Sequence, residues 1–225
     1  MRNMYPERVA KALQRAKANI HAGHPELALP DLERAVAKVP KGFDAWFLLG
    51  QAKILLNDYG DAETCLKKAT HYDPADAGAW FNLGVTYSAR GQFAEAIPCY
   101  TRAAQYAKTA PVDAIHNLGS CLMSLARFDE AASTFEVLVG LHGGADGQVL
   151  LGMAYQGGGH VEKAAAAFSH ALDRDMDNYT VNMGLSTCRF MQGDIARAMH
   201  FAGRALALKA GDADALAMIE RCRLG

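Results

Sequence analysis

Residues 80–103 read WFNLGVTYSARGQFAEAIPCYTRA, and this stretch decides the fold. Its first half carries four residues at i, i+3, i+4 and i+7, the spacing of residues on one face of a helix: Trp80, Leu83, Gly84 and Tyr87. Gly91 ends that helix. The second half carries three residues at i, i+4 and i+7: Ala96, Tyr100 and Ala103. The stretch therefore predicts two helices whose backbones approach closely at the small residues.

The same pattern recurs at intervals of about 34 residues along the chain. Trp46 precedes Trp80 by this interval, and leucine–glycine pairs follow it at 49–50, 83–84, 118–119 and 151–152. A fixed period of this length indicates a repeat architecture in which each unit stacks on the next. We therefore expect six two-helix repeats, at about 9–42, 43–76, 77–110, 112–144, 145–178 and 179–212.

Trp-x2-Leu-Gly-x2-Tyr followed by Ala-x3-Tyr-x2-Ala resembles the tetratricopeptide repeat (TPR), and the resemblance extends over roughly 200 of the 225 residues. It is weaker in the first repeat, where Arg15 and Ala16 replace Leu-Gly, and in the sixth, where Ser186 replaces the glycine. Terminal repeats of such arrays often diverge because one side faces solvent. The resemblance implies an all-α fold, a right-handed α-solenoid forming a single TPR domain over residues 1–225.

Residues 213–224 predict a helix that caps the last repeat. Leu216, Ile219 and Cys222 would share its apolar face, while charged residues occupy the rest of its surface. Such a helix would shield the open end of the sixth repeat from water.

The composition narrows the class of protein. The chain is 51% hydrophobic and 21% charged, with a formal net charge of -1, which argues against disorder and against a nucleic-acid-binding protein. It lacks an apolar run near the ~20 residues that a membrane-spanning helix needs, and its first residues lack the core of a secretory signal. We expect a cytoplasmic protein without membrane insertion. One alternative for residues 1–23 is a basic amphipathic targeting helix, although their repeat register favours the first helix of the fold.

Sequence signatures of catalysis are missing: there is no GxSxG, HExxH or GxxxxGK[ST] motif. The glycines at 157–159 fall at the expected turn of the fifth repeat rather than in a phosphate-binding loop. His21 and His24 flank a similar turn without further metal ligands. Four of the five cysteines recur in the repeat register, which suggests small packing residues, although a redox pair stays open as an alternative. We expect no enzyme activity, no cofactor and no metal.

The TPR resemblance implies that the first helices line a concave groove. Carrying the groove positions of the family over to this chain predicts nine partner contacts: Phe47, Gln51, Phe81, Asn82, Val85, His116, Asn117, Met153 and Met183. A side-chain amide such as that of Asn82 or Asn117 can bind a peptide backbone through both its donor and its acceptor. Methionine side chains adapt to varied apolar partners.

These features predict a non-enzymatic protein–protein interaction module or scaffold, whose groove binds a helix or an extended peptide of a protein partner. Chaperone C-terminal tails are not expected, because Asp113 occupies a position of the family's carboxylate clamp and would repel a carboxylate. Two alternatives stay open: a self-assembling homo-oligomeric scaffold, and an accessory subunit of a separate enzyme such as a glycosyltransferase or sulfotransferase. The second rests on the expectation that the chain has no room for a catalytic domain beyond the cap helix.

Overall fold

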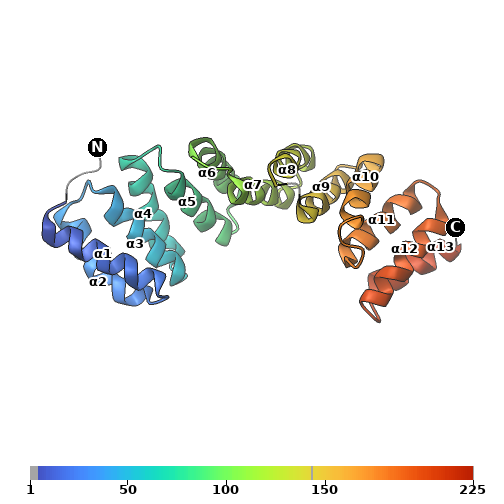
Figure 1. Ribbon diagram of the computed structural model, residues 1–225, viewed down its shortest axis with the longest axis horizontal. Helices are drawn as coiled ribbons and strands as arrows, with labels where there is room; N and C mark the ends of the chain where they lie inside the picture. The colour runs from blue at the N-terminus through green and yellow to red at the C-terminus, as the bar shows by residue number, and fades with distance from the viewer. Residues whose placement is uncertain (1–4, 143, 225) are drawn as a thin grey trace. The chain divides into compact units, whose positions relative to one another are not determined.

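A computed structural model describes residues 5–142 and 144–224, and this part of the chain consists of thirteen α-helices joined by short loops, without a strand (Figure 1). The helices are α1 (Glu7–His21), α2 (Pro25–Lys38), α3 (Phe43–Leu55), α4 (Tyr59–Tyr72), α5 (Ala77–Ala89), α6 (Phe93–Tyr106), α7 (Val112–Ser124), α8 (Phe128–His142), α9 (Ala145–Gly157), α10 (Val161–Leu172), α11 (Tyr179–Met191), α12 (Ile195–Leu208) and α13 (Ala213–Leu224).

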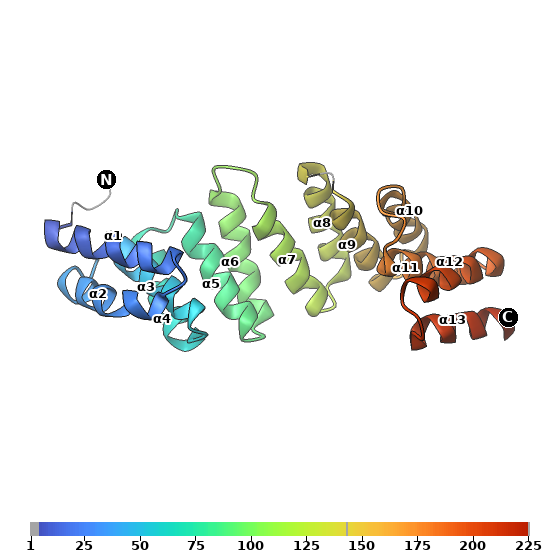
Figure 2. The same cartoon turned by 60° about the horizontal axis from the view of Figure 1, so that its bottom comes forward.

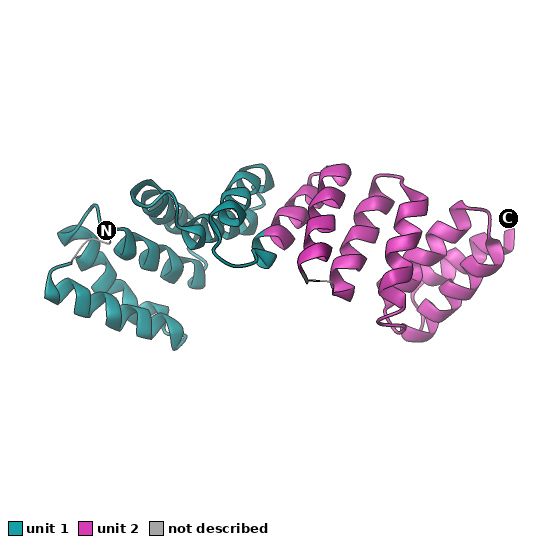
Figure 3. Ribbon diagram, turned by 45° about the horizontal axis from the view of Figure 1, so that its top comes forward, with its two compact units in different colours: residues 1–114 teal, residues 115–225 magenta. Residues whose placement is uncertain are grey.

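From α1 to α6, and again from α8 to α13, each helix packs on the next one along the chain, as expected for an all-α solenoid (Figure 2). The chain divides into two compact units, unit 1 (residues 1–114) and unit 2 (residues 115–225), and the division falls within α7 (Figure 3). None of the described helices is long and apolar enough to cross a membrane.

Every hairpin turn holds one residue in the left-handed region of backbone space. These residues are Gly23, Asn57, Gly91, Ala126, Gly159 and Gly193. Glycine adopts a positive φ without steric cost, whereas the Cβ of Ala126, with φ of 55°, crowds the following carbonyl. Gly159 belongs to the expected turn of the fifth hairpin, so the glycine run at 157–159 is explained by chain reversal.

The leucine–glycine signature reflects close packing within a hairpin. A Cβ added at Gly84 would lie 2.8 Å from the ring of Tyr100, and one added at Gly152 would lie 2.7 Å from the ring of Phe168. Both rings come from the second helix of the same hairpin and are almost completely buried. Glycine is therefore required because the partner helix supplies a large side chain to the same space.

The apolar face of α13 differs from the expected one. Its buried residues are Ala215, Met218 and Cys222. The last two pack with Ala198 and Ala202 of α12, and Ile219 lies at the edge of this cluster. Leu216 is 48% exposed, so its predicted place on the buried face was wrong. The helix turns Met218 toward α12 instead, and the long methionine side chain fills the space beside two alanines.

Candidate binding site

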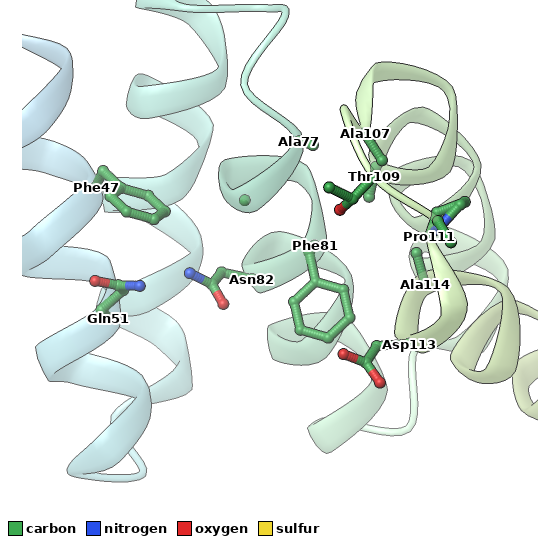
Figure 4. A pocket seen from close by; sticks show the side chains of 13 residues that line it. Phe47, Gln51, Ala77, Phe81, Asn82, Ala107, Thr109, Pro111, Asp113 and Ala114 are labelled. Carbon is green, nitrogen blue, oxygen red and sulfur yellow. The ribbon is translucent and has the colours of Figure 1, made fainter. Parts of the chain in front are cut away.

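Unit 1 carries a pocket of about 360 Å³ at its first helices, named here the central pocket (Figure 4). Phe47 and Gln51 of α3 line it together with Phe81 and Asn82 of α5. The remaining walls come from the first residues of α5, from α6 and the loop that follows it, and from the first residues of α7. The pocket thus combines two aromatic rings with two side-chain amides, a common composition for a site that binds an apolar group in a fixed orientation.

Small residues keep the central pocket open. Alanine or glycine occupies six lining positions: Ala77, Gly78, Ala103, Ala107, Ala110 and Ala114. At Gly78 an added Cβ would already lie 3.5 Å from the ring of Phe47, at ordinary van der Waals contact. A larger side chain at this position would therefore extend into the space that the pocket leaves free.

The aromatic rings of the pocket are held by neighbouring rings. Phe47 stacks on Phe43 one turn earlier in α3, with ring centroids 5.4 Å apart and planes inclined by 13°. Phe81 meets the ring of Tyr100 edge to face at 5.8 Å. Because Tyr100 is buried against α5, the position of Phe81 is set before any ligand arrives. A ligand would lose little free energy in ordering this surface.

A second hollow of about 340 Å³ adjoins the central pocket, because Phe47 and Gln51 line both. We name it the upstream pocket. Its other walls are Lys17, His21, Phe43, Asp44, Leu48 and Asp76. The two hollows form a path along the first helices of unit 1, which is lined by aromatic rings and by a set of charged side chains that we call its rim.

Carboxylates predominate along this rim. Asp44 and Asp76 line the upstream pocket and Asp113 lines the central one, against the single lysine Lys17. Asp76 also caps α5, since its Oδ1 accepts a hydrogen bond from the backbone N–H of Ala79 at 2.8 Å. The rim therefore favours a ligand that carries positive charge beside its apolar group.

Tyr5 ties the chain before α1 to the start of α3. The backbone N–H of Asp44 donates to the Tyr5 hydroxyl at 3.0 Å. Burial, together with the nearby Asp44 carboxylate, raises the pKa of Tyr5, so the phenol remains neutral at physiological pH. This contact holds the first turn of α3, from which Asp44 and Phe47 reach the upstream pocket.

Four of the nine predicted contact residues meet in the central pocket: Phe47, Gln51, Phe81 and Asn82. In Figure 4 the amides of Gln51 and Asn82 point into the space between α3 and α5. Val85 lies one turn further along α5, half-buried, and lines neither of these two pockets. The structure thus groups the predicted residues of α3 with those from the first half of α5.

The other four predicted contacts lie in unit 2. His116 is exposed on α7, and its Nδ1 is 3.3 Å from Oδ1 of the adjacent Asn117. On α9, Met153 is 39% exposed. Met183 of α11 packs partly against the buried cluster that includes Met218, so part of its side chain belongs to the core.

Several residues that shape the pockets were not among the nine predicted contacts. Lys17 and His21 of the upstream pocket lie on α1, in the hairpin whose repeat signature is weak. The alanines and the glycine of the central pocket gave only one signal, the run of small residues at 77–79. Small residues do not mark a site in a sequence, because their importance lies in the space that they leave.

The cysteines lie in the interior of the fold. All five are buried. Burial raises the pKa of the Cys65, Cys99 and Cys188 thiols to about 11, which keeps them protonated at neutral pH. Among the residues that the structure describes, no group of three His, Cys, Asp or Glu side chains could hold a metal ion.

Comparison with known proteins identifies the repeat. A family model described as tetratricopeptide repeat matches residues 19–84 and 157–222, which together exceed half of the chain. Two further models with the same description match residues 77–109 and 114–145. A search of curated proteins gives no match in sequence.

Solved structures share the fold. YrrB, described as a TPR protein with an unusual peptide-binding site, superposes with a TM-score of 0.75 at 16% identity, over 84% of this chain and 97% of YrrB. The structure of pilF of Pseudomonas aeruginosa superposes with a TM-score of 0.70 at 16% identity, over 96% of this chain and 98% of pilF. MamA of Desulfovibrio magneticus RS-1 superposes with a TM-score of 0.67 at 18% identity, over 76% of this chain and 97% of MamA. At these identities the likeness concerns the fold alone.

Proposed function

The chain belongs to the tetratricopeptide repeat family, and on this basis we propose that it is a non-enzymatic interaction module whose unit 1 binds a segment of a protein partner. The observation that carries the proposal is the path of two hollows that adjoin at Phe47 and Gln51. TPR arrays present such surfaces to peptides, and YrrB is described as having a peptide-binding site of its own.

The lining indicates the chemistry of the partner segment. Phe47 and Phe81 offer aromatic surface to one bulky apolar side chain. Asp44, Asp76 and Asp113 favour a lysine or arginine beside it. The segment would therefore carry an apolar anchor with a basic neighbour.

The two amides favour an extended peptide over a helix. Gln51 and Asn82 each offer one carbonyl acceptor and two N–H donors. The backbone of an extended peptide leaves its N–H and C=O groups free to bond with them, whereas a helix satisfies most of these groups internally. The other predicted contacts stay part of the proposal as positions further along the array: Val85, His116, Asn117, Met153 and Met183.

A peptide-display selection tests this function. Wild-type protein is used to select binders from a random library, and the dissociation constants of the selected peptides are then measured by calorimetry. We expect enrichment of a bulky apolar residue next to lysine or arginine. Phe81→Glu should weaken the binding of these peptides at least about tenfold, because it places a charge on the floor of the pocket.

Leu27→Glu is the matched control. Leu27 is 58% exposed on α2 and lines neither hollow, so the same substitution there should leave peptide affinity unchanged. Both variants must show the wild-type helicity and melting temperature. Selected peptides that bind Phe81→Glu as tightly as wild type would place the binding surface elsewhere and refute the proposal.

A further inference from the structure

The first hairpin differs from the next two at one pair of positions. In the second and third hairpins these positions hold leucine and cysteine, Leu49 with Cys65 and Leu83 with Cys99. Leu49 and Cys65 are buried in a cluster with residues of α1 and α2, so this pair faces the preceding hairpin. The first hairpin has Arg15 and Asp31 instead. An apolar contact surface has thus been replaced by an ion pair.

Asp31 holds two guanidinium groups at once. Nε and Nη2 of Arg15 donate to its two carboxylate oxygens, each at 2.6 Å. Nη2 of Arg34 donates to Oδ1 of the same carboxylate at 2.9 Å, and Nε of Arg34 donates to the carbonyl of Pro30 at 2.8 Å. The two guanidiniums therefore lie side by side, each oriented by two hydrogen bonds, and each keeps unused donors.

These groups line a hollow of about 200 Å³ between α1 and α2, named here the basic pocket. Arg8 and Lys38 line it as well, so four cationic side chains surround one carboxylate. The side chain of Asp31 is only 6% exposed, whereas those of Arg15 and Arg34 are 67% and 69% exposed. The exposed part of the lining is therefore mainly cationic, with Asp31 as its one acidic residue among those that the structure describes.

The positive groups are ordered without a ligand. Hydrogen bonds from Arg15 lower the pKa of Asp31, so the carboxylate that orients the two arginines stays ionised at neutral pH. Arginine presents a planar fork of donors that suits phosphate oxygens, and orienting it in advance lowers the entropy that binding would cost. The arginines compensate the buried charge of Asp31, and in return the carboxylate fixes the orientation of their two exposed guanidinium groups.

We propose that the basic pocket binds a phosphate group carried on a phosphorylated side chain of a protein partner. A phosphate dianion offers three oxygens to the donors of Arg15 and Arg34, and its charge is balanced by Arg8 and Lys38. The site lies on α1 and α2, apart from the hollows around Phe47 that carry the proposed peptide binding. The two proposals are therefore independent.

The walls of the pocket favour a protein over a lipid surface. Among the residues that the structure describes, the uncharged walls of the pocket are Val9, Ala12 and Ala35, and none of them is a bulky exposed side chain that could insert into a bilayer. The volume suits one small group and is below that of pockets for drug-sized molecules.

Nuclear magnetic resonance titration of the full chain tests the site, with the Nε–H signals of Arg15 and Arg34 as local reporters. The probes are O-phospho-L-serine, inorganic phosphate and L-glutamate at constant ionic strength. We expect phosphoserine and phosphate to shift both signals with saturation, and glutamate to bind at least about tenfold more weakly, since a monoanionic carboxylate engages fewer donors.

Arg15→Gln/Arg34→Gln should weaken phosphoserine binding at least about tenfold. The control is Arg197→Gln/Arg223→Gln, which removes two arginines of similar exposure that pair with Asp194 and Glu220 on other helices. This control should bind like wild type. Arg8→Gln/Lys38→Gln leaves the Asp31 contacts in place and should also weaken binding, so the test remains decisive if the first variant unfolds.

Four results would overturn the proposal. Phosphoserine binding that is equal in wild type and in both pocket variants would exclude the pocket, as would equal losses in the Arg197/Arg223 control. Binding of inorganic phosphate without phosphoserine would show that a side chain cannot enter. Pocket-dependent binding to phosphatidic acid vesicles, with no effect of phosphoserine, would assign the pocket to a membrane instead.

Discussion

In the fifth hairpin Gly152 of α9 faces Phe168 of α10, and in the sixth the same two positions hold Ser186 of α11 and Ala202 of α12. Phe168, Ser186 and Ala202 all have zero exposure. The Ser186 hydroxyl donates to the carbonyl of Ala198 at 2.7 Å, a bond that is possible because alanine replaces the large ring nearby. The two hairpins therefore fill this contact differently: a glycine lies against a large ring in the fifth, and two small side chains with a hydrogen bond occupy it in the sixth.

The first hairpin shows an intermediate solution with Ala16 and Leu32, both fully buried. Relative to the fifth hairpin, the first helix gains the methyl group of Ala16, and the second helix carries the smaller side chain of Leu32 in place of a phenyl ring. In both terminal hairpins, a residue larger than glycine on the first helix is thus accompanied by a side chain smaller than phenylalanine on the second helix. Close packing makes a protein interior sensitive to each added or removed methylene, which is the physical reason for this compensation.

The largest effect is expected for Phe168→Ala. The ring lies between Gly152 and Gly184, where added Cβ atoms would approach within 2.7 Å and 2.5 Å. Its removal leaves a cavity that two glycines cannot fill, so the free energy of unfolding should fall by about 3–5 kcal/mol. Ala202→Gly in the sixth hairpin should cost about 1 kcal/mol. Urea denaturation followed by circular dichroism measures both, and equal losses would contradict the comparison.

Gly152→Ala should destabilise the protein by about 1–3 kcal/mol, because the new methyl group meets the ring of Phe168. Adding Phe168→Leu reproduces the pair of the first hairpin, Ala16 with Leu32. The double variant should therefore be more stable than the sum of the single effects predicts, by at least about 0.5 kcal/mol. A double-mutant cycle measures this coupling, and strict additivity would mean that the two positions do not share one volume.

Ser186→Ala should lower the free energy of unfolding by about 1 kcal/mol, since the buried carbonyl of Ala198 loses its bond with the hydroxyl. Ser124→Ala is the control, because Ser124 is exposed and donates to the carbonyl of Ser120 on its own helix. The free energy of unfolding of this control variant should stay within about 0.5 kcal/mol of the wild-type value. If both variants lose the same free energy of unfolding, the hydrogen bond from Ser186 to Ala198 contributes no more to stability than the bond within one helix at Ser124.

Ala126→Gly should raise the free energy of unfolding by about 0.5–1 kcal/mol. Ala126 is exposed, and its φ of 55° places its Cβ in a crowded position that glycine avoids. The gain is reduced by the greater backbone entropy of glycine in the unfolded chain. Thermal melting gives the direction, and a lower melting temperature would show that the fourth turn is not strained.

The smallest effect concerns pH at the end of the sixth hairpin. Hydrogen bonds from Lys209 and Tyr179 lower the pKa of Asp212 to about 2. Because the folded pKa lies below the unfolded value of about 3.9, this contribution to stability is complete above about pH 4 and is lost as pH falls toward 2. Asn178 caps the start of α11 as Asp212 caps the start of α13, but without charge.

Asp212→Asn makes the two caps alike and should reduce the difference in melting temperature between pH 6 and pH 3. Melting curves of wild type and variant at both values provide the measurement. An unchanged difference would assign the acid sensitivity to other carboxylates.

Much of the fold was predictable because its signals are local. The spacing of Trp80, Leu83, Gly84 and Tyr87 follows the turn of a single helix, and recurrence of that spacing located the neighbouring helices. Family register also named Phe47, Gln51, Phe81 and Asn82, which share the central pocket. The remaining predicted contacts have no such common pocket in unit 1, and Met183 has a partly structural role.

By itself the sequence determined the repeating helical hairpins, because helix periodicity and turn geometry depend on residues close together in the chain. Only the tertiary structure decided that Met218 rather than Leu216 faces α12, that small residues such as Gly78 leave a pocket open, and that Asp31 clamps two arginines. Each of these features depends on the volume and charge that neighbouring helices bring to the same space, and periodicity along one helix carries no information about either.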